Sequence, residues 1–166
     1  MSLTPWIILI FLSLLPLVEL RLAIPAGILS GSVPFFFGWT VSGLGLPAFL
    51  VLPLIILTNT LLGFGIFDVL HKIDDRLRRS SLHPSYTKFL DHTQKKLAPF
   101  VKKYGFLGVA LFISLPIPGS GVYIGSIGSF VLGVPKSSFR KACFLGVVLA
   151  SVLVTILTVT GQSLFG

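Results

Sequence analysis

The chain has 166 residues, of which 54% are hydrophobic and only 11% charged, and its formal net charge is +8. Soluble domains carry about a quarter charged residues, so this composition excludes an ordinary soluble domain and indicates an integral membrane protein. The single cysteine, Cys143, excludes a disulfide framework. The basic residues gather in 72–103 and 136–141, which is typical of cytoplasmic membrane loops and not of a nucleic-acid-binding face.

The first two apolar segments are too short to cross a bilayer as helices. Residues 5–18 would give a helix of about 21 Å, and residues 22–30 a shorter one, against a hydrocarbon core of about 30 Å. Pro16 and Pro25 flank the break between them. We therefore predict a re-entrant helical hairpin with its tip near 16–25, because irregular backbone at this depth is tolerated only inside protein or beside water.

Glu19 and Arg21 lie in this tip and are the only ionisable side chains before Phe67. Charges within the bilayer usually line a bundle interior or a watery cavity and mark a functional site. The arginine fork suits bidentate binding of phosphate or carboxylate, and Glu19 is a candidate for coupling to H⁺ or Na⁺. In an unwound tip the two side chains would converge. The alternative is a buried, ligand-free ion pair that locks the hairpin, and exchanging its two residues should then partly restore stability.

The pattern of a broken segment followed by a long one occurs again in the second half of the chain. Residues 46–67 and 142–164 are each long enough to span a bilayer. Between the basic regions, the uncharged segment 104–135 is interrupted at 115–121 by the sequence Leu-Pro-Ile-Pro-Gly-Ser-Gly. We predict a second re-entrant hairpin with its tip at this interruption.

The second tip contains Pro116 and Pro118 and supplies backbone amides instead of charge. Amides at the N-terminus of a half-helix attract anions through their unpaired N–H groups and the helix dipole. Facing Arg21, this tip would form a phosphate-binding site at mid-depth. The candidate binding residues in it are Gly119, Ser120, Gly121 and Tyr123. The alternative is that the glycines only make the turn and allow close helix packing.

Charge placement favours two hairpins. If every apolar block spanned the membrane, the two basic regions would lie on opposite faces, against the positive-inside rule. With two hairpins, both basic loops are cytoplasmic, and both termini and the uncharged loop 31–45 lie on the other face. The predicted fold is a single all-α membrane domain of two inverted repeats, 1–67 and 104–166, each a re-entrant hairpin followed by a transmembrane helix. A basic amphipathic linker, 68–103, joins them.

Two segments, ELRLAIPAG in the first hairpin and PIPGSGVYIG in the second, resemble the signature segments of the small multidrug export proteins. That family is similar in turn to the DedA/VTT superfamily, whose members have two re-entrant hairpins facing each other across the bilayer. The resemblance covers essentially the whole chain and implies a transporter-like fold in a prokaryotic plasma membrane. The similarity to the DedA/VTT superfamily implies translocation of lipids, including polyprenyl-phosphate carriers. In contrast to bacterial DedA proteins, the first hairpin has a single carboxylate.

Outside the tips, Arg140 opens the last apolar segment and is a candidate for binding an anionic headgroup, or else an interface anchor. Thr58 and Asn59 are polar groups in the middle of the first long segment, where side-chain hydroxyls usually bond to their own helix. The three histidines are spaced so that no two share a helical face. We therefore expect no metal site and no cofactor beyond a coupling ion.

The predicted function is a membrane transporter, not an enzyme, that translocates a lipid-linked phosphate or another amphipathic anion. Two alternatives stay open: a non-transporting scaffold with a structural Glu19–Arg21 pair, and a small-molecule drug exporter. Drug export would need an aromatic cavity, but the aromatic residues gather in 35–39, a region typical of an interface belt. Because two spans enclose little volume, we expect a homodimer or a higher assembly surrounded by membrane lipids.

Overall fold

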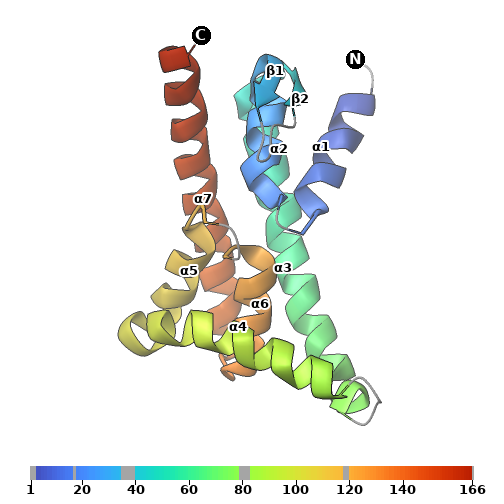
Figure 1. The fold of residues 1–166 in the computed structure, drawn as a ribbon, viewed down its shortest axis with the longest axis vertical. Coiled ribbons are helices and arrows are strands. Elements are labelled where there is room, and N and C mark those ends of the chain that lie inside the picture. The colour runs from blue at the N-terminus through green and yellow to red at the C-terminus, as the bar shows by residue number, and fades with distance from the viewer. Residues whose placement is uncertain (1–2, 17, 35–39, 79–82, 118–119, 166) are drawn as a thin grey trace.

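The computed structural model describes residues 3–16, 18–34, 40–78, 83–117 and 120–165. This part of the chain forms seven α-helices and one β-hairpin (Figure 1). Four of the helices are short: α1 (Thr4–Leu14), α2 (Glu19–Ile28), α5 (Phe106–Ser114) and α6 (Val122–Val131). The longer ones are α3 (Ala48–Arg78), α4 (His83–Tyr104) and α7 (Lys136–Phe165). The strands are β1 (Ser30–Pro34) and β2 (Thr40–Leu44).

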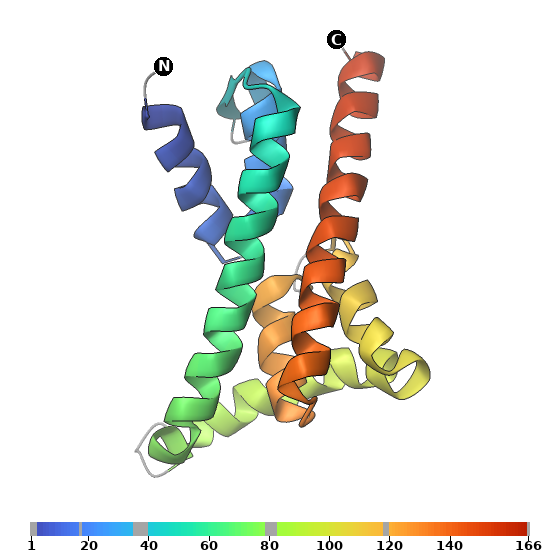
Figure 2. The ribbon, with the colours of Figure 1, turned by 180° about the vertical axis from the view of Figure 1, so that it is seen from behind.

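The short helices form two hairpins that enter the molecule from opposite ends (Figures 1 and 2). In Figure 1, α1 descends from the N-terminus and α2 returns to the same end, whereas α5 rises from the other end and α6 descends again. The two tips meet at mid-height. Helices of 9 to 11 residues reach only about 14–17 Å, roughly half of a hydrocarbon core. Each hairpin is followed by a long helix, as the sequence predicts, and the inverted-repeat relation stays a prediction.

Among the described residues, two helices are long and apolar enough to cross a membrane, Ala48–Asp74 within α3 and Lys136–Gly161 within α7. They correspond to the two spans predicted from the sequence. Large apolar side chains on both helices face outward; Phe49 is 74% exposed and Ile156 is 56% exposed. Such surface is unfavourable in water but suits a hydrocarbon environment. The chain is therefore an all-α membrane protein apart from its β-hairpin.

One face of α3 holds the two hairpins together. Val51, Ile55, Asn59, Gly63 and Phe67 follow one another at intervals of four residues, and all five are buried. The absence of a side chain at Gly63 allows close approach of α6 and α7. An added Cβ there would lie 2.9 Å from Val122 Cγ1 and 2.5 Å from Cys143 Sγ. The tips are thus fixed against a long helix that runs past both of them.

The structure corrects two sequence predictions in the first half. Residues 30–34 and 40–44 pair as two antiparallel strands, with Ser32 opposite Ser42, in the segment 31–45 that was predicted to be a loop. Pro25 lies inside α2 and not at the tip. The first tip is therefore shorter than 16–25: α2 begins at Glu19, which has a left-handed φ of +46°, and Arg21 lies within the helix instead of an unwound segment.

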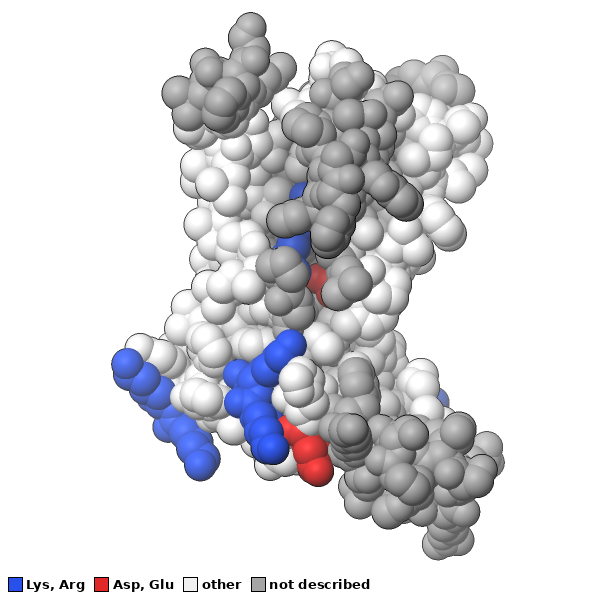
Figure 3. Space-filling view, in the orientation of Figure 1, with Lys and Arg blue, Asp and Glu red and all other residues white. Residues whose placement is uncertain are grey.

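The linker helix α4 crosses the end of the molecule opposite both chain termini (Figure 1). It packs on α6 through Leu97, which is fully buried and would contact a Cβ placed at Gly128. Its described lysines point outward, and Figure 3 shows basic side chains gathered at this lower end. The predicted assignment of this end to the cytoplasm stays a prediction.

Candidate functional site

The carboxylate of Glu19 sits on the N-terminus of α6. Its Oε2 accepts a hydrogen bond from the amide of Val122 at 3.1 Å, and its Oε1 accepts one from the amide of Tyr123 at 3.2 Å. These are the first two amides of α6, which have no acceptor within the helix. Only 2% of Glu19 is exposed, so the amides and the positive end of the helix dipole take the place of hydrating water.

Arg21 binds the other side of the same tip. Its Nη2 donates to the carbonyl of Leu115 at 2.6 Å and to Ser120 Oγ at 2.8 Å, and its Nη1 donates to the carbonyl of Ser120 at 3.3 Å. Leu115 directly follows the last residue of α5, so its carbonyl belongs to the negative end of that helix. The carboxylate thus meets a positive helix end and the guanidinium a negative one.

The backbone at this contact is strained. Glu19 has a φ of +46°, and it is the non-glycine residue with a positive φ in the described part of the chain. Such a conformation costs on the order of 1–3 kcal/mol and persists only where surrounding contacts enforce it. Opposite it, Gly121 has a φ of +106°, and a Cβ added there would overlap the Glu19 carboxylate. Both residues are held in unusual conformations so that the carboxylate reaches the α6 amides.

A third contact joins the hairpins at their tips. The hydroxyl of Tyr123 donates a hydrogen bond to the carbonyl of Leu14, the last residue of α1. The sequence suggested Tyr123 as a donor for a ligand, whereas here it bonds to the first hairpin. The two tips are therefore connected through a carboxylate, a guanidinium and a phenol.

The structure brings together most of the residues that the sequence singled out. Glu19, Arg21, Ser120, Gly121 and Tyr123 meet at the tip contact. Within the described part of the chain, the hydrogen bonds of the two charged side chains go to the second hairpin and not to each other. Pro16 and Pro116 lie in the two turns. Pro118 and Gly119 lie outside the described residues.

The backbone groups that complete the site leave no signal in the sequence. The amides of α6 were expected to attract an anion, but the anion they bind here is the chain's own Glu19. The carbonyls of Leu14 and Leu115 were not foreseen at all. Backbone amides and carbonyls are the same at every residue, so only the docking of the tips selects them.

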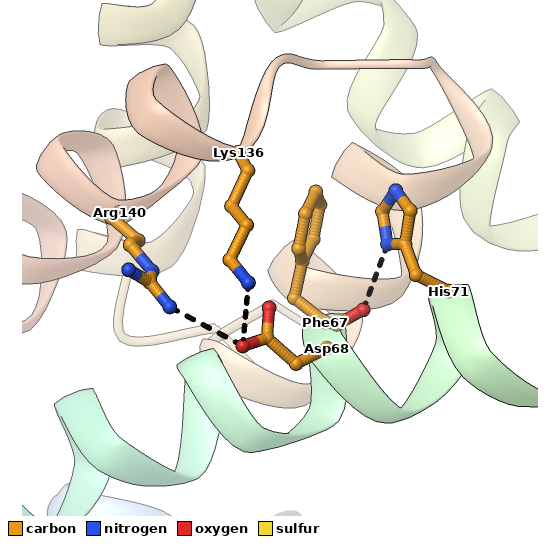
Figure 4. Close-up of polar contacts among 5 residues, drawn as sticks. All are labelled: Phe67, Asp68, His71, Lys136 and Arg140. Carbon is orange, nitrogen blue, oxygen red and sulfur yellow. Dashed lines mark hydrogen bonds and ion pairs between the residues drawn. The ribbon is translucent and has the colours of Figure 1, made fainter.

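Arg140 belongs to a different cluster, at the lower end of α3 and α7 (Figure 4). Its Nη2 lies 3.3 Å from Asp68 Oδ2, and Lys136 Nζ lies 2.8 Å from the same oxygen. The guanidinium also lies over the ring of Phe64, with 5.3 Å between its carbon and the ring centroid. The sequence placed Arg140 with the substrate-binding residues, and the structure does not bring it to Arg21.

Replacing Asp68 with asparagine is expected to lower thermal stability only slightly. The side chains of Lys136 and Arg140 are 52% and 47% exposed, so their attraction to Asp68 is screened by water and salt. The check is the melting temperature of the detergent-solubilised variant at low and high salt. A small loss at low salt should disappear at high salt; a large loss that persists would show that this cluster holds α3 to α7.

Two half-depth hairpins meeting at a buried polar contact, beside two long apolar helices, define a helical integral membrane protein with a polar site at its centre. Residues 19–153 match the family model described as "Putative small multi-drug export protein". This match covers most of the chain, from Glu19 at the start of α2 through the second tip, so the protein belongs to that family, which its description presents as export proteins. Searches of curated proteins and of solved structures gave no match. The similarity to DedA proteins stays a prediction.

Proposed function

We propose that this protein transports a substrate with an anionic group, such as a lipid-linked phosphate or another amphipathic anion, through the contact between its hairpin tips. The observation that carries the proposal is the carboxylate of Glu19 on the amides of Val122 and Tyr123. The chain has an anion-binding helix N-terminus at mid-height, and its own side chain fills it.

Exchange of Glu19 for a substrate anion needs no new binding groups. Phosphate oxygens would accept hydrogen bonds from the same two amides that the carboxylate uses. Arg21 directs three hydrogen bonds to the second tip, and a guanidinium has five N–H donors, so two remain for a ligand. The strained backbone of Glu19 favours its release, because a left-handed conformation relaxes once the carboxylate leaves the amides. In this proposal the structure corresponds to the site closed by Glu19.

An amphipathic substrate fits the surroundings of the site better than a fully polar one. Exposed apolar side chains border both hairpins, among them Phe11 at 62%, Ile117 at 54% and Leu111 at 40%. A lipid chain would stay in contact with such surface and with the bilayer while its headgroup enters the tip contact. Homo-oligomerisation and H⁺ or Na⁺ coupling belong to the same proposal.

Two alternative functions have support of their own. The hydrogen bonds that Glu19 and Arg21 make to protein groups favour a structural contact and a non-transporting scaffold. The family description favours export of a small drug-like molecule. The aromatic residues that such an exporter would use, 35–39, lie outside the described residues.

The test is headgroup translocation of a polyprenyl phosphate in liposomes that contain the purified protein. Wild type should move the phosphate and leave a neutral polyprenol in place. Arg21→Lys keeps the charge but loses the planar fork, so we expect at least an approximately tenfold slower rate, equivalent to about 1.4 kcal/mol. Arg140→Lys is the matched control, because it makes the same change away from the tips, and it should stay near wild type.

Each contrary result points to a different function. If Arg21→Lys and Arg140→Lys behave alike, the tip contact is not the site. If a lipophilic cationic dye is moved and the phosphate is not, the protein exports drug-like molecules. If the folded wild type moves none of these substrates, the scaffold alternative is favoured.

A further inference from the structure

Asn59, the only asparagine of the chain, carries a buried amide oxygen without a hydrogen-bond partner in the described part of the structure. The residue is 0% exposed, and its Nδ2 donates to the carbonyl of Ile55 at 3.0 Å, so the amide cannot turn over without losing that bond. The next residue, Thr60, also has a buried and unpartnered oxygen, Oγ1. A buried acceptor without a partner is costly, and it often marks a missing water or ion.

The packing of α2 on α3 places Asn59 at the height of Glu19. The two helices run in opposite directions (Figure 1). Near the upper end of this contact, a Cβ added to Gly27 of α2 would lie 2.8 Å from Val51 Cγ1 of α3. Glu19 lies eight residues below Gly27, and Asn59 lies eight residues below Val51.

The contact between α3 and α6 also places Asn59 near Glu19. One turn below Asn59, a Cβ added to Gly63 would lie 2.9 Å from Val122 Cγ1. The amide of Val122 binds Glu19 Oε2 at 3.1 Å. Asn59 is therefore bracketed by two helices that both lead to the Glu19 carboxylate.

Glu19 retains capacity to bind a further partner. A carboxylate offers about four lone-pair sites, and the two α6 amides occupy two of them. The third buried orphan oxygen, Ser129 Oγ, lies about two turns further down α6 and does not belong to this group.

We propose that Glu19, Asn59 and Thr60 form a binding site for a sodium ion at the tip contact. The ligands would be a carboxylate oxygen, the Asn59 amide oxygen and the Thr60 hydroxyl, all hard oxygen donors suited to a hard cation. A single carboxylate, whose charge is already shared with the α6 amides and faces Arg21 nearby, suits a monovalent ion better than a divalent one, because calcium sites use several carboxylates. The binding of sodium stands independently of transport, and its use as a coupling ion rests on the function proposed above.

The first test measures sodium binding to the purified full chain in detergent. The melting temperature is followed while NaCl replaces choline chloride at constant ionic strength, and radioactive sodium binding is measured on the same samples. We expect the binding of radioactive sodium to saturate, and the melting temperature to rise by on the order of 5 °C when sodium reaches about 100 times its dissociation constant. Asn59→Leu and Glu19→Gln should lose this response and bind sodium at least about tenfold more weakly.

Thr58→Val is the matched control, because the Thr58 hydroxyl already bonds to the carbonyl of Leu54 at 2.7 Å. This variant should respond to sodium as wild type does. Equal melting temperatures in sodium and choline, without displaceable radioactive sodium, would overturn the proposal and leave a buried water as the partner. A wild-type response in Asn59→Leu would overturn it as well. Sodium binding without phosphate flux would reject the proposed transport but not the sodium site. Sodium-independent phosphate flux without sodium binding would reject the sodium site but not the transport.

Discussion

Exchanging the two charged residues, as Glu19→Arg together with Arg21→Glu, is expected to destabilise the protein more than neutralising either residue alone. In the structure the carboxylate faces amides of α6 and the guanidinium faces carbonyls at the end of α5. Neutralising one buried charge leaves its partners unsatisfied, at a cost of about 3–5 kcal/mol. The exchange adds repulsion, because it sets a cation against N–H groups and an anion against carbonyls.

The measurement is the thermal unfolding of Glu19→Gln, Arg21→Met and the exchanged double variant in detergent. Arg21→Lys serves as the control that preserves charge and should be the mildest change. The order of stability should be Arg21→Lys, then the two neutral variants, then the exchange. A simple ion pair, as considered from the sequence, would instead be partly restored by the exchange, and that result would contradict the contacts described here.

Gly121→Ala should be the most damaging glycine substitution at the site. The φ of +106° is unfavourable for any residue with a Cβ, at a cost of about 1–3 kcal/mol. The new Cβ would also overlap the Glu19 carboxylate, and overpacking typically adds about 1–3 kcal/mol. We therefore expect a loss of about 3 kcal/mol or more in the free energy of unfolding.

Two further glycines separate these two causes. Gly133 has a φ of +65° with nothing within 4 Å of an added Cβ, so Gly133→Ala should show the backbone strain alone. Gly65, inside α3, also has open space but an ordinary φ, and Gly65→Ala should be neutral or stabilise by up to about 1 kcal/mol. If Gly121→Ala costs no more than Gly133→Ala, the carboxylate moves aside freely and Glu19 is not held on α6.

The two helical hairpins could be predicted from the sequence because the prediction depends on the lengths of the apolar segments. Apolar segments that are too short to span a bilayer and are interrupted by Pro and Gly can adopt few arrangements in it. In the structure, a helix of 10 residues follows each interruption, α2 after the first and α6 after the second. The β-hairpin could not be predicted from the sequence. Its strands contain serine, glycine and a terminal proline, so they lack the alternating apolar pattern that identifies a half-buried strand.

The partners of the candidate site were harder to predict than its residues. Glu19 and Arg21 are conspicuous because they are charges in an apolar segment. That the carboxylate would fill the anion site of the opposite hairpin depends on how the tips dock, which no local pattern encodes. The contact of Arg140 could not be predicted for the same reason, because its ion pair with Asp68 joins residues 72 positions apart in the sequence.

The half-depth hairpins also determine where a membrane voltage would act. Two hairpins that turn back at mid-height separate the two ends of the molecule by the thickness of a tip contact, and not by the length of a spanning helix. Where water reaches both tips, the electrical potential falls across this thin layer, and 100 mV is worth about 2.3 kcal/mol for each elementary charge that crosses it. An ion or carboxylate that shifts by a few ångströms past the contact would therefore carry out most of an electrogenic step.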